Sequence, residues 1–310
     1  MNALLFSLMQ ACLVILLAPL TVGIVRASKA RFQNRRGASV FQPYWALLSL
    51  CKKEMTVTKH ASWVFFAVPF AVLASACALA LLVPTFSVVG MDGLDSIFVI
   101  AAVLALGSFF LVLGGMDVAS TFGGMGSSRE MTLAALVEPV VILVLSTLGF
   151  AAHAWGLGAI AGVFAADPWY VTHPFLVFTL LSLGFVVLAE NARYPVDNPA
   201  THLELTMVHE AMILEYSGPY LAMLEAASAI KLTVLLAFFL QLAFPWMGLA
   251  FMGGMFVWPL LSLVAKLVVG GFLVACVESL CVKMRFYRMQ EYMATAYFLG
   301  LSGFILTLVF

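Results

Sequence analysis

The stretch ENARYPVDNPATHLELTMVHEAMILEYSG, residues 190–218, decides how the rest of this chain is arranged. It holds one arginine, two histidines and five of the chain's 15 acidic residues, and long apolar segments lie on both sides of it. Its carboxylates are Glu190, Asp197, Glu204, Glu210 and Glu215. Burying charge at a membrane is costly, so a cluster of charged groups between apolar segments indicates a functional site.

The composition of the whole chain indicates a membrane protein. Hydrophobic residues make up 64% of its 310 residues and charged residues 10%, whereas soluble domains carry about 25% charged residues. The formal net charge is zero, so the chain lacks the strong basic field that attracts nucleic acid. Five cysteines occur without C-x-x-C or zinc-type spacing, and we interpret them as unpaired thiols.

Eight apolar segments follow one another, and each approaches or exceeds the length that a membrane-spanning helix requires. The segment at 174–190 is the shortest. The sequence therefore predicts an all-α integral membrane protein with about eight transmembrane helices in a single membrane domain, residues 1–310. The segments comprise residues 3–25, 62–84, 96–115, 131–152, 174–190, 220–244, 255–279 and 292–310.

The distribution of basic residues predicts the orientation of these helices. Thirteen of the 15 lysines and arginines fall in alternate loops, eight of them in the loop over residues 26–61. The positive-inside rule places these loops in the cytoplasm and both termini outside. The stretch over residues 190–219 then forms an acidic cytoplasmic loop.

The basic loop over residues 26–61 contains a second predicted element. After a break at Phe41-Gln42-Pro43, apolar residues such as Tyr44 and Leu48 recur near helical spacing and are followed by two lysines. This pattern is typical of a short amphipathic helix at the membrane interface. Two interpretations stay open, a lipid-facing anchor and a docking surface for a cytoplasmic partner.

Residues 116–130 are rich in glycine and serine, but they lack the strand and the G-K-[ST] that a phosphate-binding loop requires. We interpret them as small residues that allow close packing beside a site. Glu138 and Pro139 lie about two turns inside the next span, where proline frees a backbone carbonyl. That carboxylate fits a proton or water relay, or a structural ion pair with Lys231 or Lys266.

Within the central stretch, Asn198 and Pro199 are typical of a helix start, and the residues from there to Gly218 are compatible with a helix. On such a helix Glu204 and Glu215 share a face that must meet water, a partner or an internal cavity. No H-E-x-x-H motif supports a metal site. Proton handling suits the carboxylates better, because burial and like charges raise carboxylate pKa values.

The same stretch resembles the third cytoplasmic loop of a membrane subunit that respiratory complex I, as its subunit 1 or H, shares with the group 4 membrane-bound nickel–iron hydrogenases. Two other stretches resemble that family as well, N-R-R-G at 34–37 with the following F-Q-P-Y, and G-S-S-R-E with L-V-E-P around Arg129 and Glu138. The second of these is more similar to the hydrogenase branch, which includes formate hydrogenlyase. Ala200 and His202 depart from the family, which usually carries further carboxylates there. In the central stretch the resemblance rests on Glu190, Arg193, Pro195, Asp197, Pro199, Glu204 and the E-Y-S-G at 215–218.

The resemblance implies a membrane-anchor and coupling subunit of an oxidoreductase complex in a bacterial or archaeal plasma membrane, without a redox site, metal or cofactor of its own. Hydrophilic partners would carry iron–sulfur clusters and, in hydrogenases, the nickel–iron site, and antiporter-like membrane subunits would move protons or sodium ions. A quinone-chamber subunit of a complex I-like NADH or quinone dehydrogenase, with a bound quinone, and a stand-alone secondary transporter are the alternatives.

Two sets of residues follow for this role. We expect partner docking at Arg35, Arg36 and Arg129. We expect proton or ion coupling at Glu138, Glu190, Arg193, Asp197, Glu204, Glu210, Glu215, Glu225 and Lys231.

Overall fold

The computed structural model describes residues 3–85, 93–167, 172–197, 207–245 and 257–309. Helices dominate these residues, and they contain no strand longer than an isolated bridge between Ser96 and Gly156. The elements are α1 (Ala3–Phe32), α2 (Gln42–Cys51), α3 (Trp63–Leu82), α4 (Ile97–Asp117), α5 (Thr121–Ala152), α6 (Leu157–Ala166), α7 (Pro174–Glu190), α8 (His209–Ile213), α9 (Gly218–Ala243), α10 (Val257–Leu280), η4 (Phe286–Arg288) and α11 (Met289–Val309).

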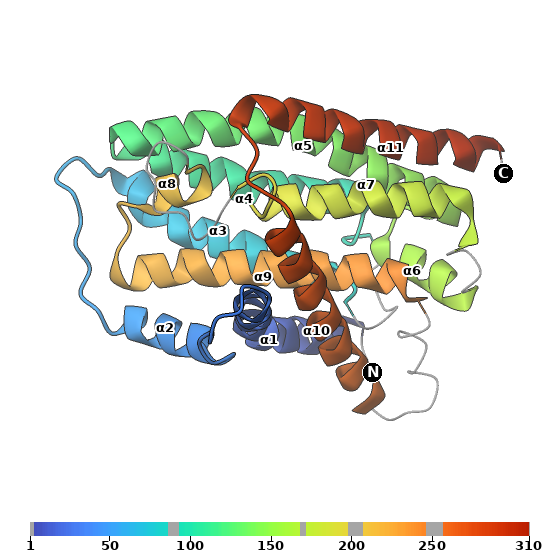
Figure 1. The fold of residues 1–310 in the computed structure, drawn as a ribbon, viewed down its shortest axis with the longest axis horizontal. Coiled ribbons are helices and arrows are strands. Elements are labelled where there is room, and N and C mark those ends of the chain that lie inside the picture. Colours follow the sequence, from blue (N-terminus) through green and yellow to red (C-terminus); the bar gives the residue numbers. More distant parts are fainter. Residues whose placement is uncertain (1–2, 86–92, 168–171, 198–206, 246–256, 310) are drawn as a thin grey trace.

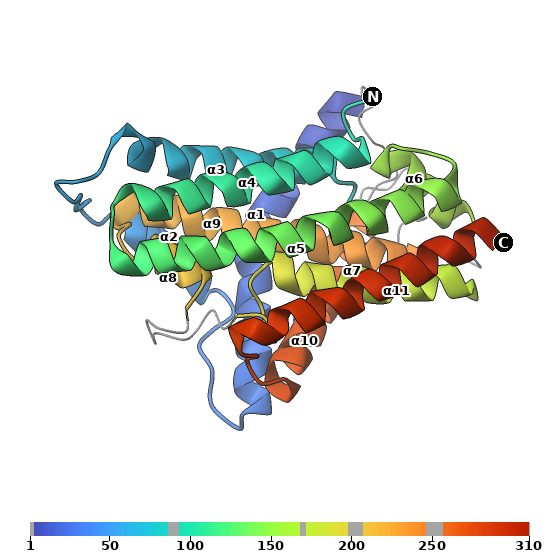
Figure 2. The same cartoon turned by 90° about the horizontal axis from the view of Figure 1, so that it is seen from above.

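Most of the long helices form one bundle. Helices α3, α4, α5, α7, α9 and α11 run roughly along a common axis, whereas α1 and α10 pack on each other and cross the bundle (Figures 1 and 2). Both views place α6 and the C-terminus toward one end of the bundle and α8 toward the other. The two ends of the molecule are therefore built from different elements.

Among the described residues, seven helices are long and apolar enough to cross a membrane, namely α1, α3, α4, α5, α9, α10 and α11. Helix α7 is shorter, with 17 residues, which is about 26 Å at 1.5 Å per residue. These eight helices match the eight predicted segments in order, and the all-α membrane fold is confirmed. Helix α6 was not predicted.

Two predicted boundaries were wrong. Helix α1 continues to Phe32, so Arg26, Lys29 and Arg31 lie on the helix and not in the loop that follows. Basic residues near a helix C-terminus interact favourably with the helix dipole, which favours this extension. Helix α5 begins at Thr121, ten residues before the predicted span, because the glycine- and serine-rich segment is itself helical.

The helix predicted from Pro199 to Gly218 is also corrected. Asn198, Pro199 and Glu204 lie outside the described residues, and within 207–217 only α8 is helical. Gly218 begins α9 and adopts a positive φ of 57°. A Cβ atom there would lie 2.9 Å from the carbonyl oxygen of Glu54, so the position suits glycine for two reasons.

The amphipathic helix predicted in the basic loop is present as α2. It packs against α1 and α9, and the hydroxyl group of Tyr44 donates a 2.6 Å hydrogen bond to the carbonyl oxygen of Leu16. Trp45 and Leu48 remain exposed on its other side. Exposed apolar side chains beside basic residues fit a helix at a membrane interface.

Candidate functional site: a charged cavity in the bundle

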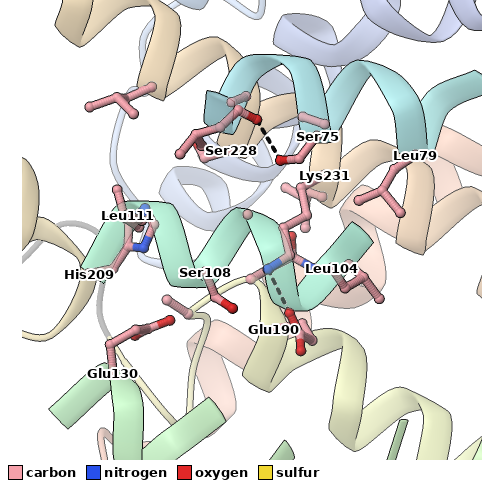
Figure 3. Close-up of a pocket in the computed structure, with 18 of the residues that line it drawn as sticks. Ser75, Leu79, Leu104, Ser108, Leu111, Glu130, Glu190, His209, Ser228 and Lys231 are labelled. Carbon is pink, nitrogen blue, oxygen red and sulfur yellow. Dashed lines mark hydrogen bonds and ion pairs between the residues drawn. The ribbon is translucent and has the colours of Figure 1, made fainter. Parts of the chain in front are cut away.

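A cavity of about 110 Å³ lies between α3, α4, α5, α7, α8 and α9. Its wall combines apolar residues with the hydroxyl groups of Ser75, Ser108 and Ser228. Figure 3 shows several of these side chains converging from different helices. The ionisable residues in the wall are Glu130, Glu190, Arg193, Asp197, His209, Glu210 and Lys231.

An ion pair joins two of the spans across this cavity. The Nζ atom of Lys231 on α9 lies 2.6 Å from the Oε2 atom of Glu190 at the end of α7 (Figure 3). The two side chains are 22% and 10% exposed. Each of the two charges is tolerated inside the bundle because it is paired with the other.

Asp197 holds the start of α8 in place. This residue is buried, and its Oδ1 atom lies 2.6 Å from the Nζ atom of Lys283 in the loop after α10. Its Oδ2 atom accepts hydrogen bonds of 3.2 Å from the backbone N–H groups of Val208 and His209. These are among the amides that a helix start leaves without internal partners, so a distant carboxylate caps this short helix.

A second ion network fixes the loop that carries Asp197. The carboxylate of Glu278 on α10 accepts from the Nζ atom of Lys29 on α1 at 2.9 Å and from the guanidinium group of Arg193 at 3.1 Å. Lys29 also lies 4.7 Å from the ring centre of Tyr194. The crossing helices α1 and α10 are thereby tied to the wall of the cavity.

Small residues let α8 approach the spans closely. A Cβ atom on Gly126 of α5 would lie 2.8 Å from the Cβ atom of Ala211, and one on Gly115 of α4 would lie 3.0 Å from Met212. The glycine- and serine-rich segment therefore has the packing role that its composition predicted.

The two polar residues of α8 have shifted pKa values. Burial, aided by the charges of Glu225 and Asp197 and opposed by those of Arg26 and Arg193, raises the pKa of Glu210 to about 7. Burial lowers the pKa of His209 to about 4, aided by the charge of Lys231 and opposed by that of Asp197. At neutral pH the imidazole is therefore uncharged, while the carboxyl group of Glu210 exchanges its proton readily.

The family model described as NADH dehydrogenase matches residues 5–310. The chain belongs to this family. It is 32% identical over 241 residues to hydrogenase-4 component C of Escherichia coli (strain K12), across 77% of this chain and 75% of that protein. It is 29% identical over 283 residues to formate hydrogenlyase subunit 4 of the same organism, across 91% of each chain.

A solved structure has the same fold as this NADH dehydrogenase family member. A chain from the membrane-bound sulfane sulfur reductase, an archaeal respiratory membrane complex, aligns with a TM-score of 0.84 at 15% identity and covers 99% of this chain and 100% of its own length. The resemblance to the complex I and hydrogenase membrane subunits, seen first in the sequence, is confirmed.

The structure brings five of the predicted coupling residues of this family member into one cavity, namely Glu190, Arg193, Asp197, Glu210 and Lys231. Glu138 is half-buried and lines a neighbouring cavity of about 210 Å³, which also includes Glu190. Glu138 forms neither of the two ion pairs considered for it, because Lys231 pairs with Glu190 and Lys266 donates to Gln241.

Three other predicted coupling residues lie elsewhere. Glu215 follows α8 and is half-buried, but it does not line the charged cavity. Glu225 on α9 is exposed, although its charge acts on Glu210. Glu204 lies outside the described residues, so its shared face with Glu215 stays a prediction.

The predicted docking residues divide into two groups. Arg35 and Arg36 are exposed, in keeping with contact to a partner. Arg129 is half-buried and donates a 3.1 Å hydrogen bond to the carbonyl oxygen of Met207, just before α8. Arg129 therefore binds the segment of its own chain that leads into α8.

Four residues of the site were missed by the sequence reasoning. Lys283 and Glu278 find their partners 86 and 85 positions away, so no local spacing signals them. His209 was considered only for metal binding. Glu130 follows Arg129 directly, and its buried Oε2 atom has no hydrogen-bond partner among the described residues. A carboxylate next to an arginine at the start of a predicted span was the available signal.

Proposed function

We propose that this chain is the non-catalytic membrane-anchor and coupling subunit of a multisubunit hydrogenase- or formate-hydrogenlyase-type complex. It would dock hydrophilic iron–sulfur subunits, with a nickel–iron site in one of them, and antiporter-like membrane subunits. It would link their redox chemistry to proton or sodium movement. The charged cavity carries this proposal, because side chains that can exchange protons line it between the short helix α8 and the spans. The two Escherichia coli relatives support the type of complex.

The cavity is suited to short proton steps through water. Its volume of about 110 Å³ gives room for a few water molecules, at roughly 30 Å³ each in the liquid. Pockets for drug-sized ligands usually measure about 300–1,000 Å³. Glu210 and neutral His209 stand at the loop side, and the pair of Lys231 with Glu190 stands at the span side. Glu190 also lines the cavity of Glu138, which extends the row of carboxylates.

Orientation and docking follow from the basic loops. We infer that α2 and α8 face the cytoplasm and that both termini lie outside, in a bacterial or archaeal plasma membrane. The exposed pair Arg35 and Arg36 would bind acidic groups of a hydrophilic partner. A single cysteine introduced at Arg35 should label only after permeabilisation, and one at Asp167 should label in intact cells. The opposite pattern would reverse the orientation.

The composition of the native complex tests the proposal directly. Tagged chain purified from its own membranes should bring along iron–sulfur subunits, a nickel-binding large subunit and antiporter-like membrane subunits. Mass spectrometry of the purified complex identifies them. Recovery of an NADH-linked or quinone-linked module would favour the complex I-like alternative, and recovery of the chain alone would favour a transporter.

The coupling role is tested at the ion pair. Lys231→Met should lower redox-driven ion uptake in inverted vesicles at least about tenfold, which corresponds to about 1.4 kcal/mol in the limiting barrier. Subunit stoichiometry should stay normal. The exposed Lys59→Met is the matched control and should leave uptake unchanged. Normal assembly with undiminished uptake in Lys231→Met would remove the pair from the pathway.

A further inference from the structure

A second, larger cavity lies outside the charged site. It measures about 670 Å³ and forms where the loop after α10 and the start of α11 meet α7. Lys283, Arg285 and Arg288 line it, together with one acid, Glu291. Its wall also includes apolar groups such as Phe185. The lining thus combines an excess of positive charge with an apolar surface.

Two of the three basic residues, Arg285 and Arg288, form no ion pair among the described residues. The third, Lys283, is engaged with Asp197. Both arginines are exposed, and η4 places them three residues apart on one rim. Arginine in such a position binds phosphate oxygens with two parallel hydrogen bonds.

The cavity stands at the level where spans end. Helix α7 ends and α11 begins at a similar position along the bundle axis, which is horizontal in Figure 1, whereas α5 extends further. The side chains of Leu280, Val282 and Tyr287 beside it are 84%, 82% and 86% exposed. Large apolar groups next to unpaired arginines mark the boundary between hydrocarbon and headgroups.

We propose that this cavity binds the phosphate headgroup of an anionic phospholipid. The arginines would hold the phosphate, and the acyl chains would lie along the outer face of α11, where Phe298 is 67% exposed. The exposed apolar residues on the same rim favour a lipid over an acidic protein segment, which needs no hydrocarbon beside the charge. Lys283 lines this cavity and pairs with Asp197, so a bound headgroup would lie one ion pair away from the cap of α8.

The test is native mass spectrometry of the full chain in detergent, titrated with phosphatidylglycerol, phosphatidylcholine or glycerol phosphate. Phosphatidylglycerol should bind at least about fivefold more tightly than phosphatidylcholine, the effect of roughly one arginine at an anionic surface. The variant R285Q/R288Q should lose that preference, and E291Q should strengthen it by removing the opposing charge. The matched control R35Q/R36Q removes two exposed arginines elsewhere and should behave as the unmodified chain.

Several results would overturn the assignment. Equal affinity for the two lipids would do so, as would equal effects of R285Q/R288Q and R35Q/R36Q. Glycerol phosphate binding as tightly as phosphatidylglycerol would indicate a site for a free anion. Loss of a co-purifying subunit from R285Q/R288Q, with lipid binding intact, would indicate an acidic protein partner. If R285Q/R288Q does not fold, a lack of any gain in E291Q is sufficient to refute the proposal.

Discussion

Replacing Asp197 by asparagine should release the start of α8. The change keeps the shape of the side chain and one acceptor oxygen but removes the charge that faces Lys283 and two backbone N–H groups. Breaking a buried ion pair on one side costs about 3–5 kcal/mol. Because Lys283 is 20% exposed and solvent takes up part of its charge, we expect a loss of about 2–3 kcal/mol in unfolding free energy.

The pKa of His209 then distinguishes two outcomes. If α8 stays in place, loss of the carboxylate charge lowers the pKa of His209 below its present value of about 4, because Asp197 acts to raise it. If α8 leaves the cavity, burial ends and the pKa rises toward the ordinary histidine value of 6.5. We expect the rise, since the capping bonds are weakened. Histidine-labelled magnetic resonance, assigned with His209→Gln, measures it.

The pKa of Glu210 adds a dependence on pH. In the folded chain the pKa of Glu210 is raised from 4.5 to about 7, so between these values the folded state holds a proton that the unfolded state releases. Stability therefore falls as pH rises through this window and levels off above about pH 7. Removing the charge of Asp197, or exposing α8, lowers the pKa of Glu210. Asp197→Asn should therefore narrow the pH range over which stability falls.

Asp95→Asn is the matched control for this experiment. Asp95 is also a buried aspartate that accepts a backbone hydrogen bond, from Gly158, but it lies by α6. Its replacement should lower the unfolding temperature without moving the pKa of His209 or Glu210. The reasoning fails if Asp197→Asn leaves both pKa values and the unfolding temperature unchanged, or if Asp95→Asn shifts His209 as much.

Three further predictions concern α8 and its surroundings. Gly126→Ala should cost about 1–3 kcal/mol, because its Cβ atom would lie 2.8 Å from Ala211, whereas Gly124→Ala in open space should stabilise α5 by about 0.4–1 kcal/mol; thermal unfolding in detergent compares them. Glu210→Gln should lower coupled ion uptake in vesicles at least about tenfold, and Glu215→Gln, outside the cavity, should lower it less. The infrared band of a protonated carboxyl group should fade with a midpoint near pH 7 and lose intensity in Glu210→Gln; a band unaffected by that substitution would contradict the assignment.

The spans were predictable because hydrocarbon in a bilayer imposes one length and one composition on every crossing helix. Residues 62–84 and 220–244 became α3 and α9 with ends within about two residues, a normal uncertainty for helix boundaries. The errors lie where this constraint ends. Helix α1 continues through three basic residues after its predicted end, and α5 begins early, in a segment rich in glycine and serine. Neither extension has the apolar signal on which the prediction rests.

The partners inside the site could not be predicted in the same way. Ion pairs join residues that are distant in sequence, such as Lys29 with Glu278, 249 positions apart. The sequence indicated that the carboxylates require cationic partners, but not which lysines or arginines supply them. The face predicted to be shared by Glu204 and Glu215 required one continuous helix over residues 199–218. The actual helix α8 is five residues long, and it presents Glu210 and His209 to the cavity.

The shortness of α7 explains how charge comes to lie so deep in an apolar bundle. With 17 residues α7 ends where α5 and α9 continue (Figure 1), and the loop after it turns inward with Arg193 and Asp197. Glu190 therefore meets Lys231, which lies well inside α9. A longer apolar helix would fill this space with hydrocarbon and leave Lys231 without a partner. The segment that resembled a span least is thus the one that creates the cavity, and its length belongs to the proposed coupling function as much as its charges do.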